Sequence, residues 1–271
     1  MKDIGLMHYF LGLEVWQIPE GIFMDQGKYA VEILKIFDML DCKAMDTPMD
    51  TNLKLLYDES SELVDMNKYG QIIGSLMYLT NTRPDICFSM STLSQYLVKP
   101  IWVHLIAAKH VMRYLKGTMD FGLYHDRYND YILYGYMDSD CAGNVVDRKS
   151  TSSGSYCLGS AVISWFSKKR SSVALSTAEA KYIASCSASY EAIWIQKLML
   201  GLFDMDLDTT VILYDNHSCI KMTENPVFHD KSKHIEISHF YIRNMVQKGV
   251  VKLQYASTNE KVSYVLTKPL S

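Results

Sequence analysis

Two aspartates at the ends of predicted strands are the residues best suited to do chemistry in this chain. Asp138 ends the β-rich run in "YGYMDSD", and Asp215 ends the run "TTVILYD". If these strands are parallel neighbours, both carboxylates lie at one edge of a sheet, where open α/β sheets bind their ligands. There they could share a divalent cation, because carboxylate oxygens are preferred ligands of such ions. The alternative is that each aspartate caps a turn or a helix.

A predicted helix that starts near Ser176 carries a lysine, Lys181. In "LSTAEAKYIASCSASYEAIW", Ser176 and Thr177 are residue types that cap helix N-termini, and Glu179 lies in the first turn, where a negative charge is favourable. Apolar residues then recur at helical spacing. The same helix carries Lys181, so a positive charge accompanies residues that otherwise suggest an all-carboxylate site.

The elements that must position these residues follow residue 131. Three β-rich runs, "YILYGYM", "GSYCLG" and "AVISWFS", precede the helix just described. After it come the strand "TTVILYD", a helix at about 216–223, a helix around 235–247, the strand "VVKLQYA" and a last short helix. The order β-β-β-α-β-α-(α)-β-α predicts an α/β domain, with a mixed sheet and helices on both of its faces.

The N-terminal part has a different pattern. Residues 1 to 26 predict a β-hairpin, with turn residues from Pro19 to Gly21 between two β-rich runs. Residues 27 to 127 are mainly helical, with a helical stretch beginning at Pro84. We therefore expect three parts: 1–26, 27–127 and 128–271.

Nucleic-acid binding, if present, must come from local basic patches, because the net charge is -3. Two patches are visible, one at helical spacing and one directly before the predicted helix of Lys181; they consist of Lys109, Arg113 and Lys116, and of Lys168, Lys169 and Arg170. The alternative is that each is simply a solvated surface.

Composition sets further bounds on the class of protein. No apolar run approaches the roughly 20 residues of a membrane span, and the N-terminus lacks the layout of a secretory signal, so we expect an intracellular protein of the cytoplasm or nucleus. The six cysteines form no CxxC pair. This argues against a zinc ribbon and a disulfide scaffold, and predicts reduced, mostly buried thiols.

A set of motifs along the whole chain resembles the C-terminal end of the Pol polyprotein of copia-type retrotransposons. The motifs are "MKDIGLMHYFLGLEV", "QIIGSLMYLTNTRPDICFSM", "AAKHVMRYLKGT", "GYMDSDCAG", "DRKSTSSGSYCLG", "VISWFSKK", "VALSTAEAKYIA", "YDNHSCIKMTENPVFHDKSKHIEI" and "VLTKPL". The resemblance implies the end of a reverse transcriptase followed by a ribonuclease H-like domain. The hairpin would then belong to the primer grip and the helical region to the thumb and connection, while the paired aspartates of the polymerase lie upstream of "MKDIG".

The resemblance also implies a chemistry and a ligand set. Enzymes of this class cleave the RNA strand of an RNA-DNA hybrid, with four carboxylates holding two Mg²⁺ (or Mn²⁺) ions. Asp138 and Asp215 match two of the four positions. Lys181 and Tyr264 stand where the family has the other two carboxylates. The ammonium of Lys181 would repel the ions and could pair with Asp138 or Asp215 instead.

Rescue by a neighbouring residue is not expected. Glu179 lies about 200° around the helix from Lys181, and Tyr264 is a neutral phenol near pH 7, a poor Mg²⁺ ligand. Asp140 shares a strand face with Asp138 but lies where a turn begins. Cys141 and His239 also depart from the family pattern.

These observations predict a fragment of a Pol polyprotein whose hydrolysis of RNA-DNA hybrids is severely impaired and which lacks polymerase activity. The alternatives are an active metal-dependent hybrid ribonuclease, a non-catalytic nucleic-acid-binding or scaffold domain, and a gene remnant that is seldom translated. We also expect the N-terminal hairpin to expose apolar surface and to promote self-association.

Overall fold

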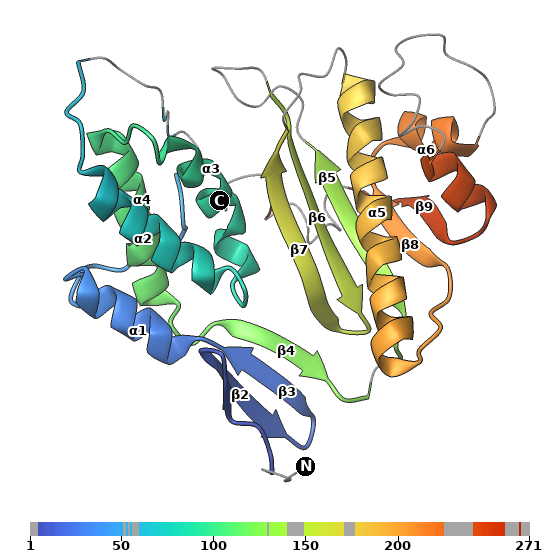
Figure 1. Ribbon diagram of the computed structural model, residues 1–271, viewed down its shortest axis with the longest axis horizontal. Helices are drawn as coiled ribbons and strands as arrows, with labels where there is room; N and C mark the ends of the chain where they lie inside the picture. Colours follow the sequence, from blue (N-terminus) through green and yellow to red (C-terminus); the bar gives the residue numbers. More distant parts are fainter. Residues whose placement is uncertain are drawn as a thin grey trace. The chain divides into compact units, whose positions relative to one another are not determined.

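The computed structural model describes residues 5–50, 53, 55, 60–128, 130–139, 149–170, 177–224, 241–257 and 266. The described residues 5–128 form one compact unit and those from 130 to 266 form another, here called the first unit and the second unit (Figure 1). None of the helices in the described ranges combines the length and hydropathy that a membrane span requires.

The first unit contains an antiparallel sheet of four strands in the order β1-β2-β3-β4. The strands are β1 (Tyr9–Phe10), β2 (Leu13–Ile18), β3 (Gly21–Asp25) and β4 (Gly122–Asp126). The predicted hairpin is confirmed as β2 and β3, whose register closes with Ile18 opposite Gly21. β4 lies at the end of the region 27–127, which is mainly helical, and this strand was not predicted from the sequence. A five-residue strand whose partner is far away in the sequence leaves little local signal.

Helices pack into one core in the rest of the first unit. They are α1 (Gly27–Ile36), α2 (Met66–Leu79), the 3-10 helix η1 (Pro84–Ile86), α3 (Cys87–Leu93), the 3-10 helix η2 (Ser94–Tyr96) and α4 (Trp102–Gly117). On α2, Tyr69, Ile72, Ile73 and Leu76 repeat at helical spacing, and each is at most 1% exposed. The side chain of Asp65 caps this helix by accepting from the Asn67 amide at 2.9 Å. The helical prediction for this region is otherwise confirmed.

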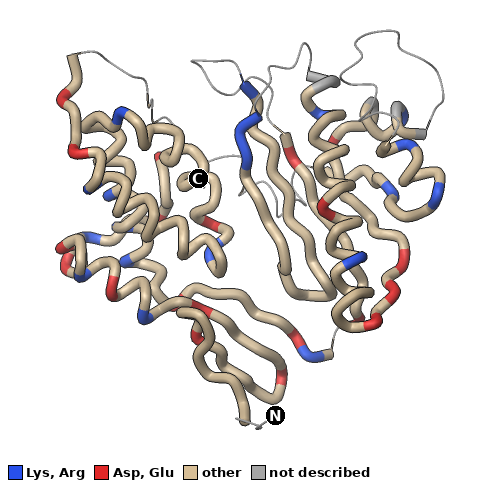
Figure 2. Tube along the Cα trace, in the orientation of Figure 1, with Lys and Arg blue, Asp and Glu red and all other residues tan. Residues whose placement is uncertain are grey.

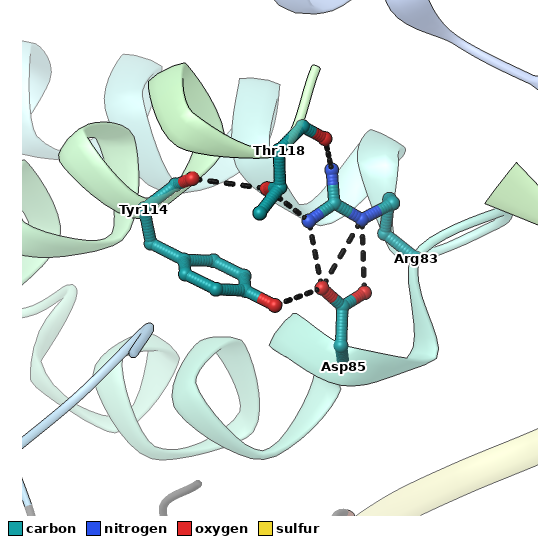
Figure 3. A network of polar contacts seen from close by, with 4 residues as sticks. All are labelled: Arg83, Asp85, Tyr114 and Thr118. Carbon is teal, nitrogen blue, oxygen red and sulfur yellow. Dashed lines mark hydrogen bonds and ion pairs between the residues drawn. The ribbon is translucent and has the colours of Figure 1, made fainter. Parts of the chain in front are cut away.

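A buried arginine joins the end of α2 to the end of α4 (Figure 3). Arg83 is 3% exposed, and its guanidinium donates to both carboxylate oxygens of Asp85 and to the Thr118 carbonyl and hydroxyl. The Tyr114 hydroxyl donates to Asp85 at 2.8 Å. The planar guanidinium therefore satisfies a carboxylate and a carbonyl at the helix end at once.

The second unit is built on a five-stranded mixed sheet in the order β7-β6-β5-β8-β9 (Figure 1). The strands are β5 (Leu133–Ser139), β6 (Thr151–Leu158), β7 (Ala161–Lys169), β8 (Thr210–Tyr214) and β9 (Val251–Tyr255). β5, β6 and β7 pair antiparallel, whereas β8 pairs parallel with both β5 and β9. The α/β class and the mixed sheet expected from the sequence are confirmed.

The helix α5 (Thr177–Phe203) lies across this sheet (Figure 1). Ala180, Ala184, Ala188 and Ala192 recur every four residues and are fully buried. Small side chains at this spacing let the helix approach the strands closely, and the Tyr156 hydroxyl of β6 donates to the Ala188 carbonyl at 2.6 Å. Helix α6 (His217–Glu224) and a helical segment at residues 241–247 complete the described part of the unit.

Candidate functional site

The two aspartates predicted from the sequence are brought together by the pairing of β5 with β8. Tyr136 lies opposite Leu213 in the parallel register, and continuing that register by two residues places Asp138 beside Asp215. Asp138 is 7% exposed within β5, and Asp215 directly follows β8. The expectation that these strands are parallel neighbours is confirmed.

Lys181 on α5 reaches the same edge of the sheet. Its ammonium lies 3.4 Å from Asp215 Oδ1, and the two side chains are only 19% and 17% exposed. Of the two partners that the sequence left open for this lysine, the structure pairs it with Asp215. Partial burial strengthens the attraction, because less water screens the charges than at an open surface.

A buried tyrosine fixes the helix backbone where Lys181 is attached. The hydroxyl of Tyr214, the last residue of β8, donates to the Lys181 carbonyl at 2.9 Å. Burial raises the pKa of Tyr214 far above its usual value, and the nearby thiol of Cys219 and carboxylates of Asp215 and Asp138 raise it further. The hydroxyl therefore stays protonated and available as a donor, which holds α5 against β8 beside Asp215.

The N-cap of α6 tests the alternative that Asp215 serves as a helix cap. The Asn216 side chain accepts from the Cys219 amide at 2.7 Å, and its carbonyl accepts from the Ile220 amide. This is the pattern of an N-cap residue. Because Asn216 caps α6, Asp215 is left at the sheet edge with Lys181.

These residues do not fit a site for two magnesium ions. Mg²⁺ binds oxygen at about 2.1 Å, so an ion on Asp215 Oδ1 would lie within about 5.5 Å of the ammonium that is 3.4 Å from that oxygen. No group of three or more His, Cys, Asp or Glu suited to a metal ion occurs in the described ranges. Asp140, Cys141, His239 and Tyr264 lie outside the described residues, as does the side chain of Glu179.

The basic run at the end of β7 lies at the same edge of the second unit's sheet (Figure 2). Lys168 is opposite Ser152 on β6, which in turn is opposite Ser139 on β5. Lys168 is exposed, while Lys169 and Arg170 are half-buried. The Arg170 guanidinium donates to the Ser152 hydroxyl at 3.0 Å. The edge therefore carries cations beside its two carboxylates.

The basic stripe on α4 is only partly free for a ligand. Lys109 is exposed and Lys116 is half-buried, but the Arg113 guanidinium donates to the Lys43 carbonyl at 2.7 Å. Arg113 therefore also ties α4 to the segment between α1 and α2.

Two residues that the sequence analysis missed extend this stripe. Trp102 is 50% exposed and Ile106 is 49% exposed, at positions i-7 and i-3 from Lys109. The same helical spacing that revealed the lysines could have found them. Exposed aromatic side chains beside cations are a feature of surfaces that bind single-stranded nucleic acid.

The hairpin exposes apolar side chains, as expected. Tyr9, Phe10, Trp16, Ile18 and Ile22 are each at least 40% exposed. Self-association through them stays a prediction. The thiols also follow expectation: among the described residues Cys157, Cys186 and Cys219 are buried, Cys42 and Cys87 are half-buried, and none of these five forms a disulfide.

Comparison with known proteins identifies close relatives of the sequence. The chain is 39% identical over 271 residues to the retrovirus-related Pol polyprotein from transposon RE2 of Arabidopsis thaliana, which covers all of this chain and 19% of the relative. It is 34% identical to the corresponding protein from transposon TNT 1-94 of Nicotiana tabacum, over 99% of this chain and 21% of the relative. It is also 37% identical to the uncharacterized mitochondrial protein AtMg00810 of Arabidopsis thaliana, over 72% of this chain and 80% of the relative. No protein-family model matches.

Two solved structures are more distantly similar. One is the LC11-RNase H1 in complex with RNA/DNA hybrid, 13% identical, covering 48% of this chain and 88% of that chain with a TM-score of 0.36. The other is the foamy viral protease-reverse transcriptase in complex with RNA/DNA hybrid, also 13% identical, covering 92% of this chain and 29% of that chain with a TM-score of 0.47.

In the second unit, three antiparallel strands are followed by two parallel ones, and α5 lies across them. This arrangement defines a ribonuclease H-like α/β fold. The chain belongs to the retrovirus-related Pol polyproteins of transposons. It spans about a fifth of the length of the curated relatives RE2 and TNT 1-94.

Proposed function

We propose that this protein binds RNA-DNA hybrids through basic residues of each of its units and that its hydrolysis of them is severely impaired. The observation that carries the proposal is the ion pair of 3.4 Å between Lys181 and Asp215 at the edge where Asp138 and Asp215 meet. Hydrolysis of this class depends on two cations that activate a water and stabilise the leaving oxygen. An edge that has two carboxylates, one of them paired with a lysine, is poorly suited to hold them.

The proposed hybrid contacts come from the cations of each unit. Lys168, Lys169 and Arg170 would contact phosphates near the edge of the mixed sheet, and Lys109, Arg113 and Lys116 would contact a template-primer duplex along α4. We propose that residues 1–26 are a primer-grip-like hairpin, residues 27–127 a thumb or connection region and residues 128–271 the ribonuclease H-like domain.

Two other functions compete with this one. In the first, the chain is an active hybrid ribonuclease in which another carboxylate, such as Asp140, completes the metal site. In the second, it is a nucleic-acid-binding or scaffold domain without any residual catalysis. The pairing of Lys181 with Asp215 favours impaired over full activity, and the cations at the end of β7 favour retained binding.

The test is cleavage of a labelled RNA-DNA hybrid with Mg²⁺ and with Mn²⁺. The native chain is compared with Asp138→Asn, with the double variant Lys181→Glu, Tyr264→Asp, and with Lys197→Glu. Lys197 is an exposed lysine on the same helix, so its variant makes the same charge change away from the edge.

We expect cleavage by the double variant alone, at a rate about 100-fold or more above the native chain, because the two restored carboxylates would let the edge hold the cations on which hydrolysis depends. Cleavage by the native chain that Asp138→Asn abolishes would show that another carboxylate completes the site. The proposal would then be wrong. Native binding without cleavage that the double variant cannot restore would favour the scaffold function.

A further inference from the structure

Lys181 replaces an expected carboxylate ligand at this edge, and it also supplies a cation there. Its ammonium is 3.4 Å from Asp215 Oδ1, and neither side chain is more than one-fifth exposed. The hydrogen bond from Tyr214 to the Lys181 carbonyl and the full burial of Tyr182 hold the helix backbone at this position. The ammonium is therefore tethered beside Asp215 by a fixed stretch of α5.

A second cation, Arg170, lies near this edge. Burial raises the pKa of the Cys186 thiol and of the Tyr214 hydroxyl, and in both cases the charge of Arg170 opposes that rise. The guanidinium donates to the Ser152 hydroxyl at 3.0 Å, and Ser152 lies opposite Ser139, the residue after Asp138 on β5. Arg170 therefore adds a positive charge near the edge where Lys181 pairs with Asp215.

The tethered ammonium of Lys181 stays close to Asp215, whereas a free ion must bind from solution. Its local concentration is set by the length of its own side chain and does not depend on the ion content of the solution. A divalent cation that bound to Asp215 would have to displace it or accept its repulsion at about 5.5 Å or less, given the 3.4 Å contact.

We infer that Lys181 is a built-in counter-ion for Asp215, which takes the electrostatic place of a divalent cation and makes the folded second unit unresponsive to Mg²⁺ and Mn²⁺. The inference extends the proposed function, since it concerns the same edge of the sheet. It adds that the replacement of an expected carboxylate by Lys181 gives Asp215 a counter-ion in the absence of any added ion.

The experiment measures the response of the full chain to divalent cations without nucleic acid. Melting temperatures are recorded in EDTA, in MgCl₂ and in MnCl₂, and Mn²⁺ binding is followed by the loss of its free-ion electron paramagnetic resonance signal. The variants are Lys181→Glu, Lys181→Met, Asp215→Asn and the matched control Lys197→Glu. Lys181→Met removes the charge without adding a carboxylate, so it serves if Lys181→Glu does not fold.

We expect the wild-type chain and Lys197→Glu to melt at the same temperature in all three solutions. Lys181→Glu should melt lower in EDTA and recover by several degrees with Mn²⁺, because a ligand that binds only the folded state stabilises it. Lys181→Met should show a smaller response of the same sign.

Two results would overturn the inference. The first is a rise in the wild-type melting temperature with Mg²⁺ or Mn²⁺ that Asp215→Asn removes, since the edge would then bind ions despite the lysine. The second is the absence of any ion response in both Lys181 variants, since the ammonium would then not be what keeps ions away. Neither result depends on hybrid cleavage, so failure here is distinguishable from failure of the proposed function.

Discussion

Each unit contains a cation paired with an aspartate, and the two pairs are built differently. In the first unit, Arg83 and Asp85 approach to 2.7 Å through several hydrogen bonds, and Arg83 is 3% exposed. In the second unit, Lys181 and Asp215 are 3.4 Å apart and share a single contact. A guanidinium matches the planar carboxylate, whereas an ammonium is a compact point charge on a flexible stem. The first pair therefore holds helices together, and the second mainly sets the charge of an edge.

Removing the cation of each pair is the sharpest way to separate these roles. Arg83→Met should lower the free energy of unfolding of the first unit by about 3 to 5 kcal/mol, because Asp85 and the Thr118 carbonyl lose a buried partner. Lys181→Met should cost the second unit about 1 kcal/mol. Hydrogen exchange followed by mass spectrometry reports the two losses separately, in peptides from α4 and from α5.

The control for this comparison is Arg127→Met, which changes an exposed arginine of the first unit. It should leave exchange in α4 within about 0.5 kcal/mol of the wild-type chain. Equal losses for Arg83→Met and Lys181→Met would mean that the number of hydrogen bonds does not distinguish the two pairs.

The contribution of each unit to nucleic-acid binding can be compared by substituting one exposed lysine in each. Lys168→Gln in the second unit and Lys109→Gln in the first should each weaken hybrid binding, and each should reduce the slope of log K against log salt concentration by about 1. Fluorescence anisotropy at several salt concentrations, in EDTA, measures both. A change for Lys168→Gln alone would restrict the hybrid contact to the second unit, and no change for either would contradict both proposed surfaces.

The smallest expected effect concerns pH and a buried histidine of the first unit. His104 is fully buried, and its Nδ1 accepts from the Ile101 amide at 3.2 Å. Burial lowers the pKa of His104 below its usual value of about 6.5. The unfolded chain therefore binds this proton more readily, and the stability that neutral His104 contributes is lost as pH falls below about 6.5.

Urea denaturation at a series of pH values tests this prediction. The stability of the first unit should fall by less than about 1.4 kcal/mol per pH unit on account of this residue, and His104→Gln should flatten that slope. His217→Gln provides the control, because His217 is exposed in the second unit. An unchanged slope in His104→Gln would assign the pH dependence to other groups.

Much of the fold and part of the site could be predicted from the sequence. Strands β5 to β9 and the start of α5 at Thr177 have clear local patterns, and the strand-end positions of Asp138 and Asp215 indicated a shared edge. Features that depend on distant partners could not be predicted. These include β4, whose partner strand is β3, and the contact of Arg83 with Thr118. The ion pair of Lys181 with Asp215, of the two aspartates at the edge, also depends on three-dimensional geometry that a motif alignment does not contain.

The pairing of β4 with β3 also sets the order in which the first unit can be completed during synthesis. Gly122–Asp126 lies against Gly21–Asp25, so nearly one hundred residues must leave the ribosome after β3 before its second neighbour exists. At about 5 to 20 residues per second, this interval lasts roughly 5 to 20 seconds. Throughout that time one edge of β3, with Ile22 and Phe23, has unpaired backbone groups that can join another nascent chain. Translation speed through the helical region should therefore influence how much of the protein reaches its folded state.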